Sequence, residues 1–117
     1  MYRVTETPNA VMTTYASPTQ GSEGLSLWRV EMKEGAQGPL HVFDSEQIWT
    51  VLAGVGSVEL GADTLELKEG ATVVFPAGVT RRITAGPDFV ALVAGHGTAK
   101  VSVPGEAADR GVPPWIS

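Results

Sequence analysis

The sequence predicts an all-β fold, and three observations lead to that prediction. Glycine (14) and proline (8) together supply 22 of the 117 residues, against about 12% in average usage. Valine outnumbers leucine by 15 to 8, and Val, Ile and Thr total 29. Such β-branched side chains lose rotamer freedom in a helix but pack well on a pleated sheet. Finally, short alternating runs end in turn residues at intervals of roughly ten, the spacing of a sandwich or barrel.

The expected strands follow one another from Ser26 onward. The first alternates between hydrophobic and polar residues until Gly35 to Pro39 break the pattern. Gly61-Ala62-Asp63 joins two short runs and indicates a glycine-bearing hairpin. The other runs also end at glycine or proline, which are the strongest breakers of regular structure. In chain order, the expected strands are 26–32, 48–51, 58–60, 65–67, 72–75, 79–84, 89–94 and 100–103.

One stretch, Leu40 to Ala53, leaves helix and strand open. It is the longest window without glycine or proline, and its hydrophobic residues also fit a helical spacing. Periodicity alone does not separate the two in such a run. The β-branched and aromatic content of Ile48 to Val51, and the glycine at Gly54, favour a strand.

A single domain over residues 1–117 is expected, because a chain of this size normally folds around one core. Residues 1–24, rich in Thr, Ser and Pro, have the composition of an N-terminal arm or edge strand, and residues 25–103 would form the body. Residues 104–117 have too few hydrophobic positions for a strand, and Pro113-Pro114 favours an extended tail. Trp115 and Ile116 are expected to dock on the body or on a neighbouring chain.

Composition and charge exclude several classes of function. The net charge is −5 with only eight Lys and Arg, whereas a nucleic-acid binder needs a basic footprint. The longest hydrophobic runs fall far short of the roughly 20 residues of a membrane span. The start of the chain has no hydrophobic leader region, so a cytoplasmic location is expected. With no cysteine, disulfides and thiolate metal sites are excluded.

Two segments carry most of the functional information, GPLHVFDSEQIWTVLAG at residues 38–54 and GATVVFPAGVTR at residues 70–81. An L-x-G pattern closes the first, and in the second a P-x-G pattern follows a glycine by six residues. Together they resemble the two signature motifs of the cupin superfamily, over roughly residues 25–100. The resemblance implies a small jelly-roll barrel, that is, a double-stranded β-helix. It also implies a homodimer, often formed through exchanged N-terminal strands.

The resemblance further implies where a metal would be held. Metal-binding cupins usually take two histidines, spaced one apart, and a glutamate from the first motif, and a third histidine from the second. In this chain those four positions read His41, Phe43, Gln47 and Arg81. Phe43 offers no donor atom, and Arg81 places a permanent cation where the metal would sit. We therefore expect no bound metal and no other cofactor.

Strand parity indicates what replaces the metal. His41 and Phe43 would share one face of a strand, because side chains alternate with period two. Arg81 would point into the barrel and would need an anion as its partner, since an unpaired buried cation is costly. None of the four positions supplies an acid, which favours a small anionic or aromatic organic ligand. The predicted ligand contacts are Trp28, Phe43, Gln47, Trp49 and Arg81.

Three functions stay open on this evidence. The first is a metal-independent cupin that binds a small molecule and catalyses an isomerisation, cyclisation or proton transfer, with His41 as the general acid or base. The second is a non-catalytic protein that carries or senses a metabolite in the same pocket. The third is a divergent metal cupin, of the dioxygenase or polyketide-cyclase type, in which Asp44, Glu46 or His96 completes a ligand set with His41.

Overall fold

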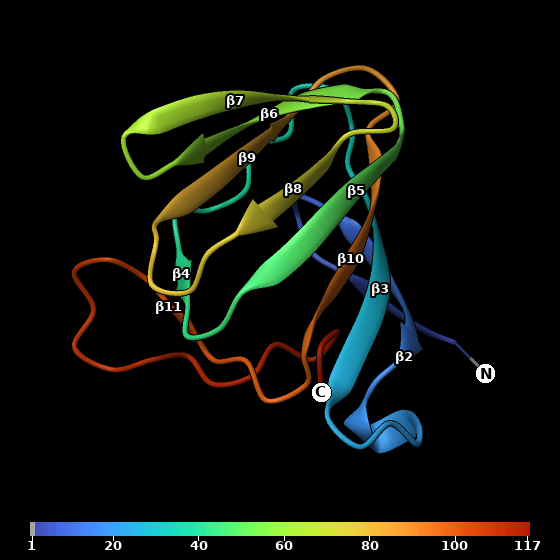
Figure 1. Ribbon diagram of the computed structural model, residues 1–117, viewed down its shortest axis with the longest axis vertical. Coiled ribbons are helices and arrows are strands. Elements are labelled where there is room, and N and C mark those ends of the chain that lie inside the picture. The colour runs from blue at the N-terminus through green and yellow to red at the C-terminus, as the bar shows by residue number, and fades with distance from the viewer. Residues whose placement is uncertain (1) are drawn as a thin grey trace.

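The computed structural model describes residues 2–117 and confirms the all-β fold (Figure 1). Each of the eight expected strands is present, with ends that shift by a few residues. The one helical element among the described residues is the 3₁₀ turn η1 (Pro18–Gln20), so none is long enough to span a bilayer. The strands are β1 (Arg3–Glu6), β2 (Val11–Ala16), β3 (Leu25–Glu31), β4 (Val42–Phe43), β5 (Gln47–Ala53), β6 (Val55–Leu60), β7 (Asp63–Lys68), β8 (Thr72–Phe75), β9 (Arg81–Ala85), β10 (Val90–His96) and β11 (Val101–Ser102).

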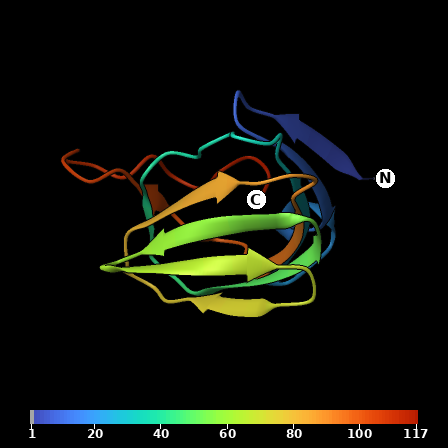
Figure 2. The same ribbon diagram turned by 90° about the horizontal axis from the view of Figure 1, so that it is seen from above.

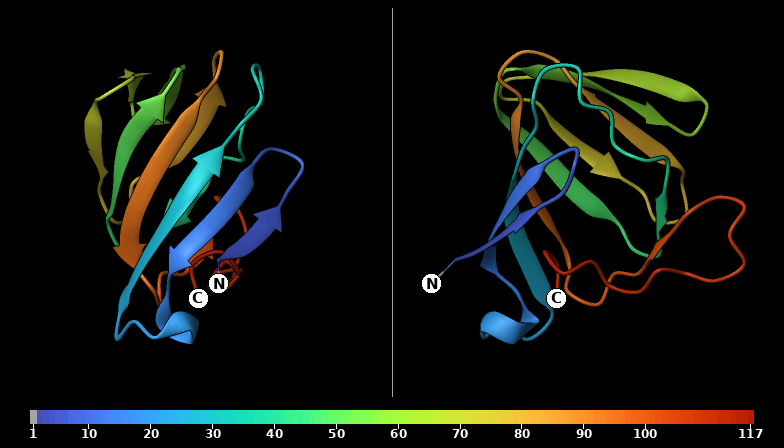
Figure 3. Two further views of the ribbon diagram at one scale, coloured as in Figure 1. Left: turned by 90° about the vertical axis from the view of Figure 1, so that its right-hand side faces the viewer. Right: turned by 180° about the vertical axis from the view of Figure 1, so that it is seen from behind.

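The strands form two facing layers, as expected for a jelly roll. One layer is a six-stranded antiparallel sheet in the order β1-β2-β3-β10-β5-β8, seen from its outer side in the left panel of Figure 3. The other contains β7, β6 and β9, which lie side by side in Figure 2, and the short pair β11-β4. An isolated antiparallel bridge between His41 and Arg81 joins these two parts of the second layer. His41 from the first sequence motif and Arg81 from the second are therefore hydrogen-bonded neighbours.

The ambiguous stretch between Leu40 and Ala53 is extended, not helical. In β5, Gln47, Trp49 and Val51 are buried, whereas Ile48 and Leu52 face outward. This alternation buries one face of the strand against the opposite layer.

Gly54, immediately after β5, shows why the first motif ends in glycine. Its φ is +70°, a left-handed conformation that costs other residues energy. A Cβ at this position would lie 2.3 Å from the backbone of Asp88. The turn from β5 into β6 thus requires the residue that the motif supplies.

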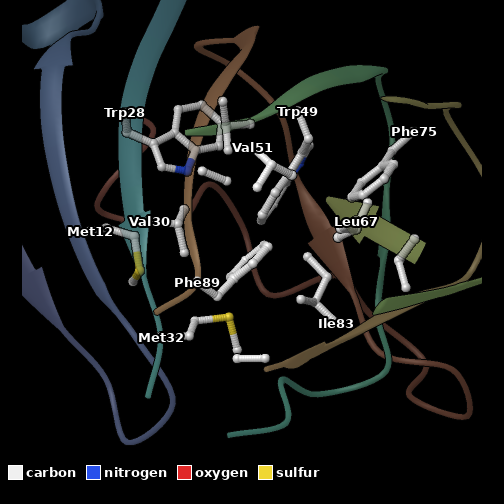
Figure 4. Packing of buried hydrophobic residues seen from close by; sticks show 14 of the residues in the cluster. Met12, Trp28, Val30, Met32, Trp49, Val51, Leu67, Phe75, Ile83 and Phe89 are labelled. Carbon is white, nitrogen blue, oxygen red and sulfur yellow. The ribbon is translucent and has the colours of Figure 1, made fainter. Parts of the chain in front are cut away.

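The hydrophobic core fills the space between the layers (Figure 4). Trp28 from β3, Trp49 from β5 and Phe75 from β8 project inward from the larger sheet, and Ile83 and Leu67 come from the opposite layer. All five are buried. Three of these residues, Trp28, Trp49 and Ile83, also line the cavity that forms the candidate site.

Both chain ends are attached to the six-stranded sheet. The predicted arm forms the hairpin β1–β2, which places β2 inside the sheet next to β3 and β1 at its edge. The hairpin folds on its own chain, and the expected homodimer stays a prediction. The last residues pass beside this hairpin, as the left panel of Figure 3 shows, where Arg3 donates a hydrogen bond to the carbonyl oxygen of Ser117 (3.0 Å).

The tail differs from the expected extended form. It forms no strand, but it turns at 104–105 and again at 114–116, where the amide of Ile116 donates to the carbonyl of Pro113 (3.0 Å). Proline at this place presets the φ angle that a turn also uses. As expected, the end of the tail docks on the body: Ile116 is fully buried, and the hydroxyl groups of Thr14 and Ser26 bind the carbonyl oxygens of Trp115 and Ile116.

Candidate functional site

The candidate site is a cavity of about 360 Å³ between the two layers. Small-molecule sites typically have volumes of about 300–1,000 Å³. Its walls come from the β1–β2 turn, from β3, β5 and β9, from the segment around β4, and from the C-terminal tail. The structure brings all six residues singled out in the sequence to this one cavity, namely Trp28, His41, Phe43, Gln47, Trp49 and Arg81.

Arg81 is the buried cation of this cavity, with 5% of its surface exposed. Its guanidinium carbon lies 4.3 Å from the ring centre of Phe43 and 5.1 Å from that of Phe75, within cation–π range. No carboxylate among residues 2–117 forms an ion pair with it. Burial lowers the pKa of Arg81 to about 9, so the guanidinium remains positively charged at neutral pH.

Gln47 is the polar neighbour of Arg81 and is almost completely buried. Its Oε1 accepts hydrogen bonds from Arg81 Nη2 (2.5 Å) and from Trp49 Nε1 (3.3 Å). Its Nε2 has no hydrogen-bond partner in the part of the chain that the structure describes. Because an amide oxygen is neutral, Gln47 orients the guanidinium without cancelling its charge.

Two backbone hydrogen bonds hold His41 beside Arg81. The amide of His41 donates to the carbonyl of Arg81 (3.1 Å), and the amide of Arg81 donates to the carbonyl of His41 (2.9 Å). Its imidazole packs edge-on against Phe43, with 5.3 Å between the ring centres. Burial, together with the positive charges of Arg81 and Arg110, lowers the pKa of His41 from 6.5 to about 4. The imidazole is therefore neutral at physiological pH.

Three polar atoms on these side chains are buried and have no hydrogen-bond partner among residues 2–117: Nδ1 of His41, Nε2 of Gln47 and Nε of Arg81. The great majority of buried polar atoms in folded proteins are hydrogen-bonded. Three such atoms on side chains that line one cavity therefore provide unused hydrogen-bonding capacity in a largely apolar enclosure. Two of them are donors, and the charge beside them is positive.

The sequence did not single out several residues that the structure places here. Phe75 stacks on Trp49, with 5.2 Å between ring centres, and faces Arg81. Arg110 and Trp115, both from the C-terminal tail, line the cavity. The strand that contains Phe75 was predicted from the sequence, but no pattern indicated that its ring contacts Arg81 and Trp49. The sequence predicted that Trp115 docks on the body, but no local pattern indicated that it or Arg110 lines the cavity, since both reach it through contacts that are distant in the sequence.

The residues of this cavity do not form a metal-ligand set. Asp44, Glu46 and His96 are exposed, and Asp44 instead accepts a hydrogen bond from the backbone amide of Lys100 (2.9 Å). Over residues 2–117, no group of three or more His, Cys, Asp or Glu side chains lies close enough together to hold an ion. A divalent metal in a catalytic site is usually bound by about three nitrogen, oxygen or sulfur donors from the protein. Here a guanidinium and a phenyl ring stand in their place.

The family of this chain can be assigned from a sequence match that covers the barrel strands. A family model described as a cupin domain matches residues 28–101, well over half of the chain. The chain belongs to this cupin family. A search of curated proteins gave no match.

Solved structures share the cupin fold of this chain. The salicylate 1,2-dioxygenase of Pseudoaminobacter salicylatoxidans, in adducts with gentisate, superposes with a TM-score of 0.75 at 18% identity over 89% of this chain. This chain spans only 31% of that dioxygenase chain. A conserved protein of unknown function from Streptococcus pyogenes superposes with a TM-score of 0.66 at 21% identity, covering 78% of this cupin and 76% of that chain. At these identities the likeness concerns the fold.

Proposed function

We propose that this cupin binds a small organic anion with a flat apolar body inside its barrel, without a metal. The observation that carries the proposal is the buried, positively charged Arg81, which has no acidic partner in the described chain. A carboxylate matches a guanidinium in shape and charge, and such a pair gains strength away from water. The aromatic side chains of Trp28, Phe43 and Trp49 supply flat apolar walls for the rest of the ligand.

Metal independence is part of the same proposal and rests on the donors in the cavity. Of the four positions that hold the ion in metal-binding cupins, only His41 retains a strong ligand. Arg81 is positively charged and would repel a divalent cation placed beside His41. The metal-dependent alternative, in which Asp44, Glu46 or His96 completes the ligand set, is disfavoured because all three side chains point to solvent.

Benzoate is expected to bind at least about tenfold more tightly than benzamide, its neutral isostere. The reason is that only the carboxylate pairs with Arg81. Isothermal titration calorimetry on the purified protein measures both affinities, and treatment with a chelator should change neither. Equal affinity for the two compounds would contradict the proposal. Loss of binding after chelation, or one equivalent of Fe, Mn, Ni or Zn in protein purified without chelators, would contradict metal independence.

A second candidate function, proton transfer on the bound anion, rests on His41. Its imidazole is neutral, and its Nδ1 has no hydrogen-bond partner among the described residues. An anion bound on Arg81 would offset the neighbouring positive charges and raise the pKa of His41, so that the ring becomes a better base. Deprotonation next to a ligand carbonyl would then form an enolate, whose oxygen Arg81 stabilises.

Phenylpyruvate tests this second function, because it is an aromatic anion with an acidic methylene group. The wild-type protein is expected to accelerate deuterium exchange at that methylene, measured by proton NMR in D₂O. The variant His41→Gln should bind phenylpyruvate yet exchange it at the rate of the buffer. Exchange at the same rate with and without wild-type protein would identify a binding protein instead of an enzyme.

A further inference from the structure

The cavity contains a second cation, Arg110, which the proposed function does not use. It comes from the C-terminal tail, 29 positions after Arg81 in the sequence. Both arginines line the same cavity, whereas no lining residue is an Asp or Glu. Two positively charged side chains therefore line the cavity, of which Arg81 is buried, whereas Arg110 is exposed and paired with Glu106, a residue outside the lining.

The backbone shows how the two arginines are placed. Val101 of β11 pairs with Phe43 of β4, and the amide of Arg110 donates to the carbonyl of Val101 (2.8 Å). Arg110 is thus tied to the strand that neighbours Phe43. Arg81 packs over the ring of Phe43 from the barrel interior. The two guanidinium groups consequently approach the Phe43 and His41 region from different elements, and both lower the pKa of His41.

We propose that the ligand carries two acidic groups, one bound by Arg81 inside the barrel and the other by Arg110 at the C-terminal wall. This inference rests on the proposed function and assigns a ligand class, the dicarboxylates, to the same cavity. A ligand of this class would bridge the two cations, and its apolar body would lie among the aromatic side chains between them.

The present partner of Arg110 supports this assignment. Glu106 binds it through two contacts, from Nε to Oε1 (3.1 Å) and from Nη2 to Oε2 (2.6 Å). The guanidinium is thus already oriented for a carboxylate. Both side chains are exposed, at 59% for Arg110 and 40% for Glu106, and an ion pair in water is weak. A carboxylate on a ligand held at the other end by Arg81 can therefore replace Glu106.

The test uses aromatic dicarboxylates with different spacings between the acids. Phthalate, isophthalate and terephthalate are titrated by calorimetry, each against its monoamide, which has the same size but a single negative charge. At least one dicarboxylate is expected to bind about tenfold more tightly than its monoamide. Arg110→Gln should remove that difference, while the preference for benzoate over benzamide remains, because Arg81 supplies that preference. Glu106→Gln should strengthen dicarboxylate binding, since it removes the competing carboxylate.

The outcomes separate this inference from the function on which it rests. If no dicarboxylate binds more tightly than its monoamide, or if Arg110→Gln weakens benzoate and dicarboxylates equally, the second acidic group is refuted. Benzoate would still bind more tightly than benzamide in that case. If benzoate and benzamide bind equally well to the wild-type protein, the proposed function itself fails.

Discussion

Replacement of Arg81 by methionine is expected to weaken benzoate binding by about 100-fold and to raise the free energy of unfolding by about 2 kcal/mol. The two effects have opposite signs because they share one cause. A buried cation without an acidic partner costs desolvation energy in the folded protein, and the same lack of a partner makes it available to an anion. Methionine fills a similar volume with an adaptable apolar chain. Trp49 still donates to Gln47 in the variant, so the amide oxygen keeps a partner.

Arg82→Met is the matched control for this variant. Arg82 is the next residue of β9, its side chain lies on the opposite face, and its partner in the ladder is Glu59 of β6. This control should leave benzoate affinity within about twofold of wild type. Urea denaturation gives the stabilities and calorimetry the affinities. If Arg81→Met lowers stability while benzoate affinity stays at the wild-type value, Arg81 is a structural residue.

Acidification is expected to destabilise the wild-type protein by about 3 kcal/mol more than the variant His41→Gln, between about pH 7 and about pH 4. The pKa of His41 falls from 6.5 to about 4 on folding, through burial and then through Arg81 and Arg110. Between these two values the unfolded chain binds a proton that the folded chain does not. The stabilising contribution of a neutral His41 is therefore complete above pH 6.5 and decreases as the pH falls toward 4. Below pH 4 the titration of His41 changes the free energy of unfolding no further.

The comparison between the two proteins isolates His41 from the carboxyl groups, which titrate in both. Urea denaturation at several pH values gives the free energy of unfolding of each protein. The difference in free energy of unfolding between the two proteins should grow as the pH falls below 6.5, the pKa of the histidine in the unfolded chain. Parallel curves over the whole range would show that His41 is protonated as easily in the folded state as in the unfolded state.

Alternation along the strands allowed much of the site to be predicted from the sequence. Once the stretch around Trp49 is a strand, period two places Gln47 and Val51 on the same buried face. The same reasoning pointed Arg81 into the barrel, and in β9 Arg81 is buried whereas the next residue, Arg82, is less so. These predictions succeed because the barrel has one interior, so each inward position contributes to the same space.

The remainder of the site depends on contacts that no local pattern contains. The hydrogen bond from Thr14 to the carbonyl of Trp115 joins residues 101 positions apart. Arg110 lies in a segment without periodicity, and only the ladder between Val101 and Phe43 brings its backbone to the cavity. The start of β9 illustrates the same limit at close range. The strand expected from Val79 begins only at Arg81, and the carbonyl of Thr80 just before it accepts from the amide of Gly61 (2.9 Å).

The C-terminal tail is held to the body mainly through its backbone, whereas the side chain of Trp115 lines the cavity. Thr14, Thr19 and Ser26 hold the last three residues by their main-chain carbonyl oxygens, and such bonds are independent of the side chain present. Ile116 also inserts its side chain into the core, and the half-buried Trp115 packs against it. Position 115, whose tryptophan faces the cavity, can therefore accept residues of other sizes while the tail keeps its hold. Variation at this single position would alter the range of molecules admitted and leave the scaffold unchanged.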